Sequence, residues 1–359
     1  MTSKERVLLS INHSQPDRVP LGWAGINSNI KKKINKYLGL NGNDEDYLLE
    51  ALDVDLRVLD LPYVGPKIHK DISGLIVGTL WGWRCKFIKN EFGSYLDYCD
   101  FPLKNADFDE IEAWPMPHPD DFAYDCLLEQ CKRYKDYCIV FGNPGLADII
   151  NSSGFLCTME KVLMDLAVGD KTILRLIDRR NEINLQILEN VLKISGKDID
   201  IIWIGEDLGT QNSALISISF FREFIRPRHQ KFIDLAKKYR KKVMIHSCGS
   251  SSWAFEDFID MGIDIIDTIQ PEAKSMSPAY LKNFFGDKLS FHGAISTAGP
   301  LSDGTVDDII KCVNQTLDIM MPKGGYIMAP THMIQDNTPP ENILAMYNAA
   351  KKFGSYIRK

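Results

Sequence analysis

Short apolar runs alternate with amphipathic stretches along most of this chain. Eight runs of three to seven residues are rich in Val, Ile, Leu and aromatic side chains, as buried strands are. They lie at 19–23, 54–59, 138–141, 201–204, 243–245, 263–269, 289–292 and 326–329. Elsewhere apolar side chains recur every three or four positions, as on helices that cover a sheet. These helical stretches lie at 4–13, 31–37, about 157–196 (two segments), 220–239, 252–261, 278–285, 305–320 and 340–356.

Strands and helices in this order, on one chain of 359 residues, predict an α/β protein with the (β/α)8 barrel fold, also called the TIM barrel. We expect 1–359 to form a single barrel domain. An open doubly wound sheet is the alternative fold. It is disfavoured because no Gly-rich nucleotide-binding fingerprint follows any of the predicted strands.

The segment 67–103 has a different sequence pattern from the rest of the chain. Short β-rich pieces lie there between Gly and charged turns, which predicts a β-hairpin insertion near the N-terminal third. Trp81, Trp83 and Tyr95 belong to this insertion. Their rings are expected either to line a pocket or, as aromatic side chains more often do, to pack in the core.

Charge and composition exclude several functions. The formal net charge of −6 disfavours a protein that binds nucleic acid or an anionic membrane. No apolar run approaches the roughly 20 residues of a membrane span. The first residues lack the apolar core of a signal peptide, and the eight cysteines include no CxxC. We therefore expect a cytoplasmic protein with reduced thiols.

His246 and Cys248 stand at the end of the run 243–245, two positions apart. Side chains at i and i+2 of a strand point to the same face. An imidazole and a thiol placed in this way can bind one zinc ion, through bonds of about 2.0 to 2.3 Å. The alternative interpretation is a buried histidine and cysteine with a purely structural role.

More polar side chains follow the other predicted strands. In a (β/α)8 barrel the chemistry lies at the carboxyl ends of the strands. The polar residues at these ends are Asn143, Glu206, Asp207, His246, Cys248, Gln270, His292, His332 and Gln335. Three of the seven histidines are among them, so a metal site at this rim is favoured over a purely structural one.

These residues are assigned the following roles. His246, Cys248, His332 and Glu206 are the predicted metal ligands, although Glu206 is alternatively a general base. Glu206, Asp207 and His292 are the catalytic candidates. The alternative role of the two acids is a helix N-cap, and that of His292 is a histidine packed in the core. The predicted substrate-binding residues are Asn143, Gln270 and Gln335.

Six segments together resemble the uroporphyrinogen decarboxylase superfamily, and within it the zinc-dependent, corrinoid-linked methyltransferase branch. They are 6–20, 205–209, 219–227, 246–249, 291–295 and 338–343. The resemblance runs from about residue 4 to residue 350 and implies a (β/α)8 barrel. In the methyltransferase branch, His-x-Cys and a later cysteine bind zinc. His332 stands at the position of that cysteine, and Ser296 replaces an aspartate of the family.

A second departure concerns the substrate. True uroporphyrinogen decarboxylases have an Arg-Gln-Ala-Gly-Arg segment after the first strand, whose arginines face the carboxylates of the substrate. Here 22–28 reads Gly-Trp-Ala-Gly-Ile-Asn-Ser, with no arginine. Decarboxylation of uroporphyrinogen is therefore disfavoured. An imidazole in place of a thiolate would also make zinc a stronger Lewis acid, which weakens the case for a thiol substrate.

The resemblance implies a zinc-dependent methyltransferase. It would move a methyl group between a small molecule, either a methyl donor or a thiol, and methylcobalamin or another corrinoid. The corrinoid would be carried by a partner protein, because the chain has no Asp-x-His-x-x-Gly motif. The alternatives are a carboxy-lyase that works without metal, and an inert scaffold. A homodimer is possible.

Overall fold

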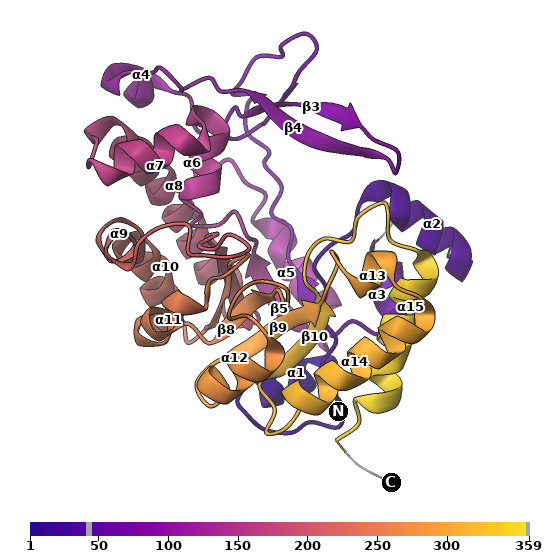
Figure 1. The fold of residues 1–359 in the computed structure, drawn as a ribbon. Coiled ribbons are helices and arrows are strands. Elements are labelled where there is room, and N and C mark those ends of the chain that lie inside the picture. The colour runs from indigo at the N-terminus through magenta and orange to yellow at the C-terminus, as the bar shows by residue number, and fades with distance from the viewer. Residues whose placement is uncertain (41–44, 357–359) are drawn as a thin grey trace.

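The computed structural model describes residues 1–40 and 45–356, and it shows an α/β fold built on a curved parallel sheet (Figure 1). Seven strands are hydrogen-bonded in the order β1-β5-β6-β7-β8-β9-β10, and every neighbouring pair is parallel. The strands are β1 Leu56–Val58, β5 Cys138–Gly142, β6 Ile201–Gly205, β7 Lys242–His246, β8 Ile265–Ile269, β9 Ser290–Ile295 and β10 Tyr326–Pro330. Most of their residues are buried on both faces, as in a sheet that is covered by helices.

Helices lie outside this sheet and follow most of its strands (Figure 1). They are α1 Ser3–Ile11, α2 Ser28–Leu38, α3 Glu45–Ala51, α4 Phe108–Ala113, α5 Asp125–Arg133, α6 Ile150–Cys157, α7 Met159–Ala167, α8 Lys171–Ser195, α9 Ile218–Phe220, α10 Arg226–Lys238, α11 Phe255–Met261, α12 Pro278–Phe285, α13 Pro300–Asp303, α14 Val306–Met320 and α15 Pro340–Phe353. A π-helical turn, Phe221–Ile225, joins α9 to α10, and a 3-10 turn, Ser252–Ala254, precedes α11. Capping boxes begin α1, α4 and α14, which satisfies backbone donors at these helix starts.

The eighth predicted strand, at 19–23, is not a regular strand. Only a single bridge, Leu21 to Met328, is formed there. The segment nevertheless reaches both edges of the sheet: Gly22 N donates to Met328 O (2.7 Å), and Asp55 N donates to Leu21 O (2.8 Å). Pro20 lacks an N–H group, which prevents a continuous ladder of hydrogen bonds. Within the described residues, the parallel sheet therefore has seven regular strands, and the segment 19–23 is an irregular one that contacts both of its edges.

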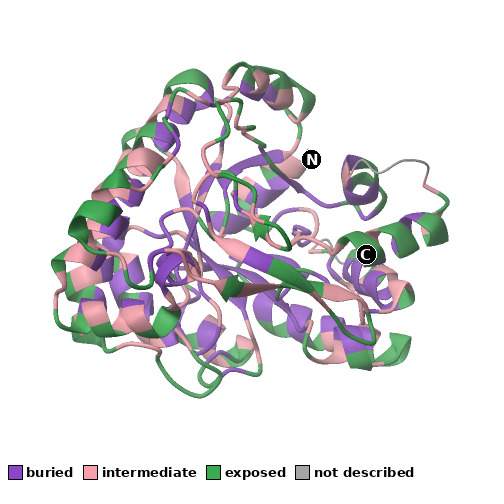
Figure 2. Cartoon of the chain, turned by 90° about the horizontal axis from the view of Figure 1, so that it is seen from above, coloured by how far each residue is buried: buried purple, intermediate pink, exposed green. Residues whose placement is uncertain are grey.

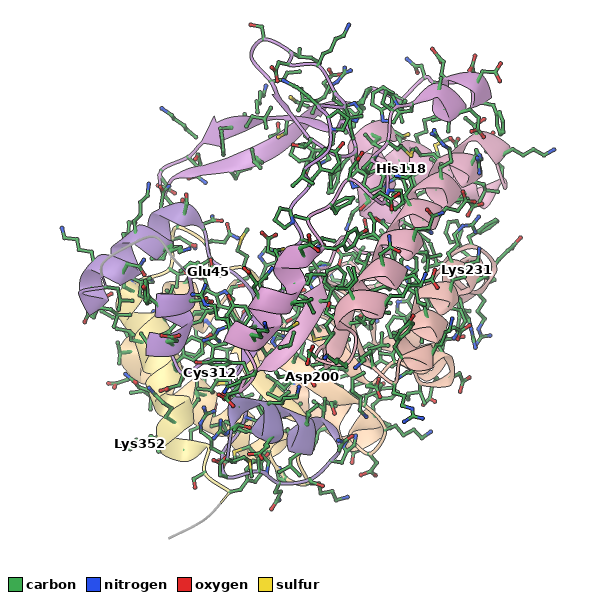
Figure 3. The ribbon with its side chains drawn as sticks, turned by 180° about the vertical axis from the view of Figure 1, so that it is seen from behind. Glu45, His118, Asp200, Lys231, Cys312 and Lys352 are labelled. Atoms are coloured by element: carbon green, nitrogen blue, oxygen red, sulfur yellow. The ribbon has the colours of Figure 1, made fainter. Side chains whose placement is uncertain are left out.

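Helix α1 covers the amino-terminal end of the sheet. Its Val7 and Ile11 pack in a buried cluster with Leu56, Val140, Ile201, Met244, Ile265 and Ile327. Lys4 at its start pairs with Asp200, directly before β6, at 2.9 Å (Figure 3). This end is therefore filled with side chains, which leaves the carboxyl ends of the strands as the place for a site.

The segment predicted as a β-hairpin insertion forms a small antiparallel sheet. Its strands are β2 Ile76–Val77, β3 Arg84–Lys89 and β4 Ser94–Asp100. Strands β3 and β4 extend away from the main sheet (Figure 1). The turn between them lies against the loop after β10. The two segments are so close that a Cβ atom at Gly93 would collide with the carboxylate of Asp336.

Burial follows this arrangement. Buried residues gather around the strands, and exposed ones lie on the outer helix faces and along the hairpin (Figure 2). Within 1–40 and 45–356, no helix is both long and apolar enough to cross a bilayer.

Candidate metal centre

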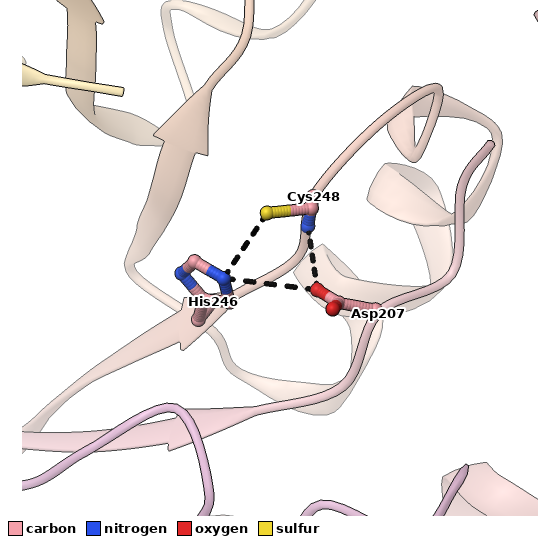
Figure 4. Close-up of side chains that lie close together, drawn as sticks. All are labelled: Asp207, His246 and Cys248. Atoms are coloured by element: carbon pink, nitrogen blue, oxygen red, sulfur yellow. Dashed lines mark hydrogen bonds and ion pairs between the residues drawn. The ribbon is translucent and has the colours of Figure 1, made fainter. Parts of the chain in front are cut away.

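Three side chains that can bind a metal meet where β6 and β7 end. They are Asp207, His246 and Cys248, and their ligand atoms all lie within 4.8 Å of one another (Figure 4). His246 Nε2 lies 3.3 Å from Cys248 Sγ and 3.7 Å from Asp207 Oδ1. His246 is the last residue of β7, whereas Cys248 follows the strand, so the loop and not the strand alone aims the thiol.

Backbone contacts hold this loop in place. Cys248 N donates to Asp207 Oδ1 (2.9 Å), and Gly249 N donates to Gln270 Oε1 (2.9 Å). Gly249 has φ of 71°, and a Cβ atom there would collide with the backbone of Gly209. Only glycine allows this close approach without strain. Gln270, predicted to bind substrate, thus supports the loop that carries Cys248.

A buried carboxylate orients the imidazole. Asp267, on β8, accepts a hydrogen bond from His246 Nδ1 (2.8 Å) and another from His292 Nδ1 (2.7 Å). Burial disfavours the charged imidazole, but the negative charge and hydrogen bond of Asp267 outweigh it and raise the pKa of His246 well above its usual value. With Nδ1 occupied in this way, Nε2 is the nitrogen left for a metal.

The three side chains fit a zinc ion. Bonds of 2.0 to 2.3 Å in a tetrahedral arrangement place neighbouring ligand atoms about 3.4 to 3.6 Å apart. The measured 3.3 Å and 3.7 Å lie close to this range. Nitrogen, sulfur and carboxylate oxygen are all zinc ligands, and the carboxylate behind His246 is the usual partner of a metal-bound imidazole.

A cavity of about 400 Å³ opens beside these residues. Asp207, His246 and Asp267 line it, as does His332 from the segment after β10. His332 is exposed and its Nδ1 lies 3.3 Å from the carbonyl of Met333, and it does not belong to the group of ligand atoms within 4.8 Å. His332 therefore lines the same cavity as Asp207 and His246, but it is not one of the three side chains whose ligand atoms cluster there.

Glu206 occupies a different environment from Asp207. Its buried carboxylate accepts hydrogen bonds from the backbone N–H groups of Ile149 (2.9 Å) and Ile150 (3.0 Å), where α6 begins, and lies 3.2 Å from His229 Nε2. Burial raises the pKa of Glu206 to about 8. Among the described residues, it is Asp207 and not Glu206 that clusters with His246 and Cys248.

The other predicted site residues lie around this centre. His292 is buried behind Asp267, and its Nε2 has no hydrogen-bond partner in the described part of the chain. Gln335 donates to Met333 O and accepts from Asn27 Nδ2, which ties the loop after β10 to the start of α2. Asn143 lines a neighbouring cavity and not the one beside the three donors.

Sequence reasoning missed Asp148 and Asp267. Asp148 is buried and lines the cavity, and burial together with the charge of Glu206 raises its pKa to about 8. Asn151 from α6 donates to Asp207 Oδ2 (2.9 Å) and was also missed. Asp267 could have been found, because it is a charged residue two positions before the end of an apolar run, in a buried strand. Asp148 carries no such local signal.

Comparisons with known proteins agree with this fold. The family model described as uroporphyrinogen decarboxylase (URO-D) matches residues 152–353. A methylated-thiol–coenzyme M methyltransferase from Methanosarcina mazei is 27% identical over 143 residues, which are 39% of this chain and 35% of that protein. The aligned part thus spans about a third of the length of this relative.

A solved structure, a methyltransferase from Methanosarcina mazei, superposes with a TM-score of 0.65 at 18% identity, over 98% of this chain and 99% of that one. At this identity the match reports the fold. The family model covers more than half of the chain, including the strand ends with Asp207, His246 and Cys248. The chain belongs to the uroporphyrinogen decarboxylase family.

Proposed function

We propose that this protein is a zinc-dependent methyltransferase that moves a methyl group between a small molecule and a corrinoid carried by a partner protein. The observation that carries the proposal is the cluster of Asp207, His246 and Cys248 at the mouth of a cavity. The two methyltransferases from Methanosarcina mazei support it by likeness of sequence and of fold. The stretch after Leu21, which has no arginine through residue 28, argues against a substrate with many carboxylates.

The residues of this site would have separate roles. Asp207, His246 and Cys248 would hold the ion, and Asp267 keeps the imidazole in the tautomer that offers Nε2. When bound, zinc supplies Lewis acidity, which lowers the pKa of a thiol or polarises the heteroatom of a methyl donor.

Asp148 is the nearest candidate for proton transfer. It lines the same cavity, and its pKa of about 8 leaves it largely protonated at neutral pH. A methyl donor that loses its methyl group leaves a heteroatom with a free electron pair, and Asp148 would give that atom a proton. With a thiol acceptor, only the ionised form of Asp148 would take the thiol proton.

Metal analysis tests the ligand set. Protein purified without chelators is expected to hold near-stoichiometric zinc, and His246→Ala, Cys248→Ser and Asp207→Asn are expected to lose most of it. His118→Ala is the matched control, because this imidazole is exposed and remote from the site (Figure 3). Cys99→Ser serves in the same way for the thiol, since Cys99 is free and exposed. Zinc content that is equal in all five variants would refute the proposed ligands.

Methyl transfer is tested separately. Anaerobic reactions with cobalamin, methyl donors and thiols are followed by the change in corrinoid absorbance, with wild type and His246→Ala in parallel. We expect a change with one substrate of the panel for wild type alone. Release of carbon dioxide from an acid by protein stripped of metal would instead support a carboxy-lyase.

A further inference from the structure

A second cavity of about 350 Å³ lies next to the one described above. Its walls are unusually aromatic. The rings that line it belong to Trp81, Trp83, Tyr98, Phe122, Phe141 and Phe155. Gly145, Ser152 and Phe155 line both cavities, so the two share a wall, and two of the three shared residues are small. We call this cavity the aromatic chamber.

The rings come from two parts of the fold. Trp83 and Tyr98 belong to the insertion at 67–103 and meet edge to face, with ring centroids 5.7 Å apart. Tyr98 also stacks on Phe155 of α6, with centroids 3.9 Å apart and planes within 7° of parallel. The insertion therefore supplies one side of the chamber and the barrel helices the other. Such walls favour a flat, apolar ligand body.

One buried charged side chain lines this apolar space, whereas Asp60, the other charged residue of the lining, is exposed. Arg180 of α8 is only 4% exposed, and its Nε has no hydrogen-bond partner among the described residues. One of its other nitrogens, Nη1, donates a long hydrogen bond to Ser153 Oγ (3.4 Å), and the guanidinium lies 5.0 Å from the ring centroid of Trp81. Part of the hydrogen-bonding capacity of a buried guanidinium thus remains unused.

Its neighbours on the same helix differ. Arg175 and Arg179 both pair with Glu112. For Arg180, no carboxylate lies within ion-pair distance in the ranges 1–40 and 45–356. An unpaired buried charge is costly, and it is the arrangement expected where a ligand supplies the counter-charge.

The acids nearby do not replace such a ligand. Burial lowers the pKa of Arg180 to about 10, so it stays charged at neutral pH. Asp148 and Glu206 act on the Arg180 guanidinium only through their charge at a distance. Among the described residues neither carboxylate forms an ion pair or a hydrogen bond with it, so the guanidinium remains available to a ligand.

We propose that the aromatic chamber binds a planar aromatic carboxylate, with its ring against the aromatic walls and its carboxylate on Arg180. Arginine binds carboxylates through charge-assisted hydrogen bonds, and Arg180 has an N–H group without a partner among the described residues. A substituent of the ring then points past Gly145 and Ser152 toward the cavity with Asp207 and His246. Resting on the methyl transfer proposed above, this names the substrate class as an aromatic acid that carries the methyl group on a heteroatom attached to the ring.

Other ligand classes fit less well. A quaternary ammonium group would find aromatic faces but also the positive charge of Arg180. An uncharged aromatic molecule would leave that charge unpaired. A short aliphatic acid would leave the rings in contact with water instead of ligand.

Binding is tested without any methyl transfer. Titration of metal-stripped protein with benzoate and 4-methoxybenzoate, followed by tryptophan fluorescence and calorimetry, is expected to show saturable binding. Benzamide, phenyltrimethylammonium and propionate are expected to bind on the order of tenfold more weakly or less, since each lacks the charge or the ring. Equal binding of benzamide, or tighter binding of phenyltrimethylammonium, would overturn the proposal.

Variants locate the site. Arg180→Gln is expected to weaken benzoate binding by on the order of tenfold or more, and Arg180→Lys by less, because it retains the charge. Arg175→Gln removes a charge from the exposed side of the same helix and should bind benzoate as wild type does. Unchanged binding by a folded Arg180→Gln would overturn the proposal. Should that variant not fold, Arg180→Lys and the ligand series on wild type still decide.

The two proposals fail in different ways. His246→Ala should lose zinc and still bind benzoate, because the chamber does not use that imidazole. Benzoate binding in a protein that holds no zinc would leave the chamber supported and the metal proposal refuted. Zinc binding without any affinity for benzoates would do the reverse.

Discussion

Asp267 is the residue whose replacement tests the metal centre most sharply. It is 2% exposed and accepts one hydrogen bond from each of two imidazoles, His246 and His292. Asp267→Asn keeps the size of the side chain but removes its charge. An amide has one oxygen and can accept from only one of the two Nδ1–H groups, so its NH2 group faces the other. We expect His246 to be held less firmly and to be a poorer ligand.

The magnitude follows from the role of such partners. Replacing a group that orients a metal-bound imidazole costs about 10- to 100-fold in metal affinity, which is about 1.4 to 2.7 kcal/mol. The loss should also depend on pH. In wild type, the raised pKa of His246 means that a proton competes with zinc at acidic pH, and this competition weakens when Asp267 is neutral. The difference between the proteins should therefore widen as the pH rises.

Competition with a chromophoric zinc chelator at several pH values measures this difference. Asp287→Asn is the control, because this aspartate is 84% exposed and pairs with Lys323 on the surface. Zinc affinity of Asp267→Asn within about twofold of wild type across the pH range would refute the reasoning, since the expected loss is at least about tenfold.

Three more predictions follow from buried positions. Phe258→Ala should lower the free energy of unfolding by about 3 to 5 kcal/mol, because Phe258 is fully buried; urea denaturation showing under about 1 kcal/mol would contradict this. Gly22→Ala should cost about 1 to 3 kcal/mol and weaken zinc binding, because a Cβ atom there collides with the imidazole of His292; unchanged thermal unfolding would argue against that crowding. Burial lowers the pKa of His229 to about 4, whereas the pKa of a histidine in the unfolded chain is about 6.5. Between these pH values the unfolded state binds a proton that the folded state does not, so the free energy of unfolding should fall as the pH drops from about 6.5 to 4. This decrease amounts to about 3 kcal/mol, and His229→Gln should flatten the pH dependence of urea denaturation over that interval.

The hydrophobic pattern predicted most of the parallel sheet, because its strands are buried on both faces and therefore appear in the sequence as continuous apolar runs. Seven of the eight runs are regular strands. The run at 19–23 has the same apolar character, but Pro20 interrupts its ladder. The pattern also predicted the β-rich insertion at 67–103, and a pocket was one of the two roles expected for Trp81, Trp83 and Tyr95. Trp81 and Trp83 line a cavity with Arg180, which the pattern did not indicate, and Tyr95 is not part of that lining.

The site was harder to predict because it depends on which way the chain turns after each strand. Glu206 and Asp207 are neighbours in sequence, and successive residues point in opposite directions. One carboxylate therefore reaches the start of α6 and the other reaches Cys248, and the sequence does not tell which. His246 and Cys248 were easier, since only two positions separate them, although the loop after β7 and not the strand alone aims the thiol.

The choice of Asp207 over Glu206 also changes the expected chemistry. A histidine at position 332, where the resembling methyltransferases have a cysteine, removes one negative charge from the ligand set. If Asp207 binds the ion together with the Cys248 thiolate, the ligands again carry two negative charges, which balance Zn²⁺. The net charge of the centre then equals that of a centre with two thiolates, which weakens the objection to a thiol substrate that His332 raised. This charge balance predicts that Asp207→Cys binds zinc as tightly as wild type does, whereas Asp207→Asn shows a large loss of zinc affinity.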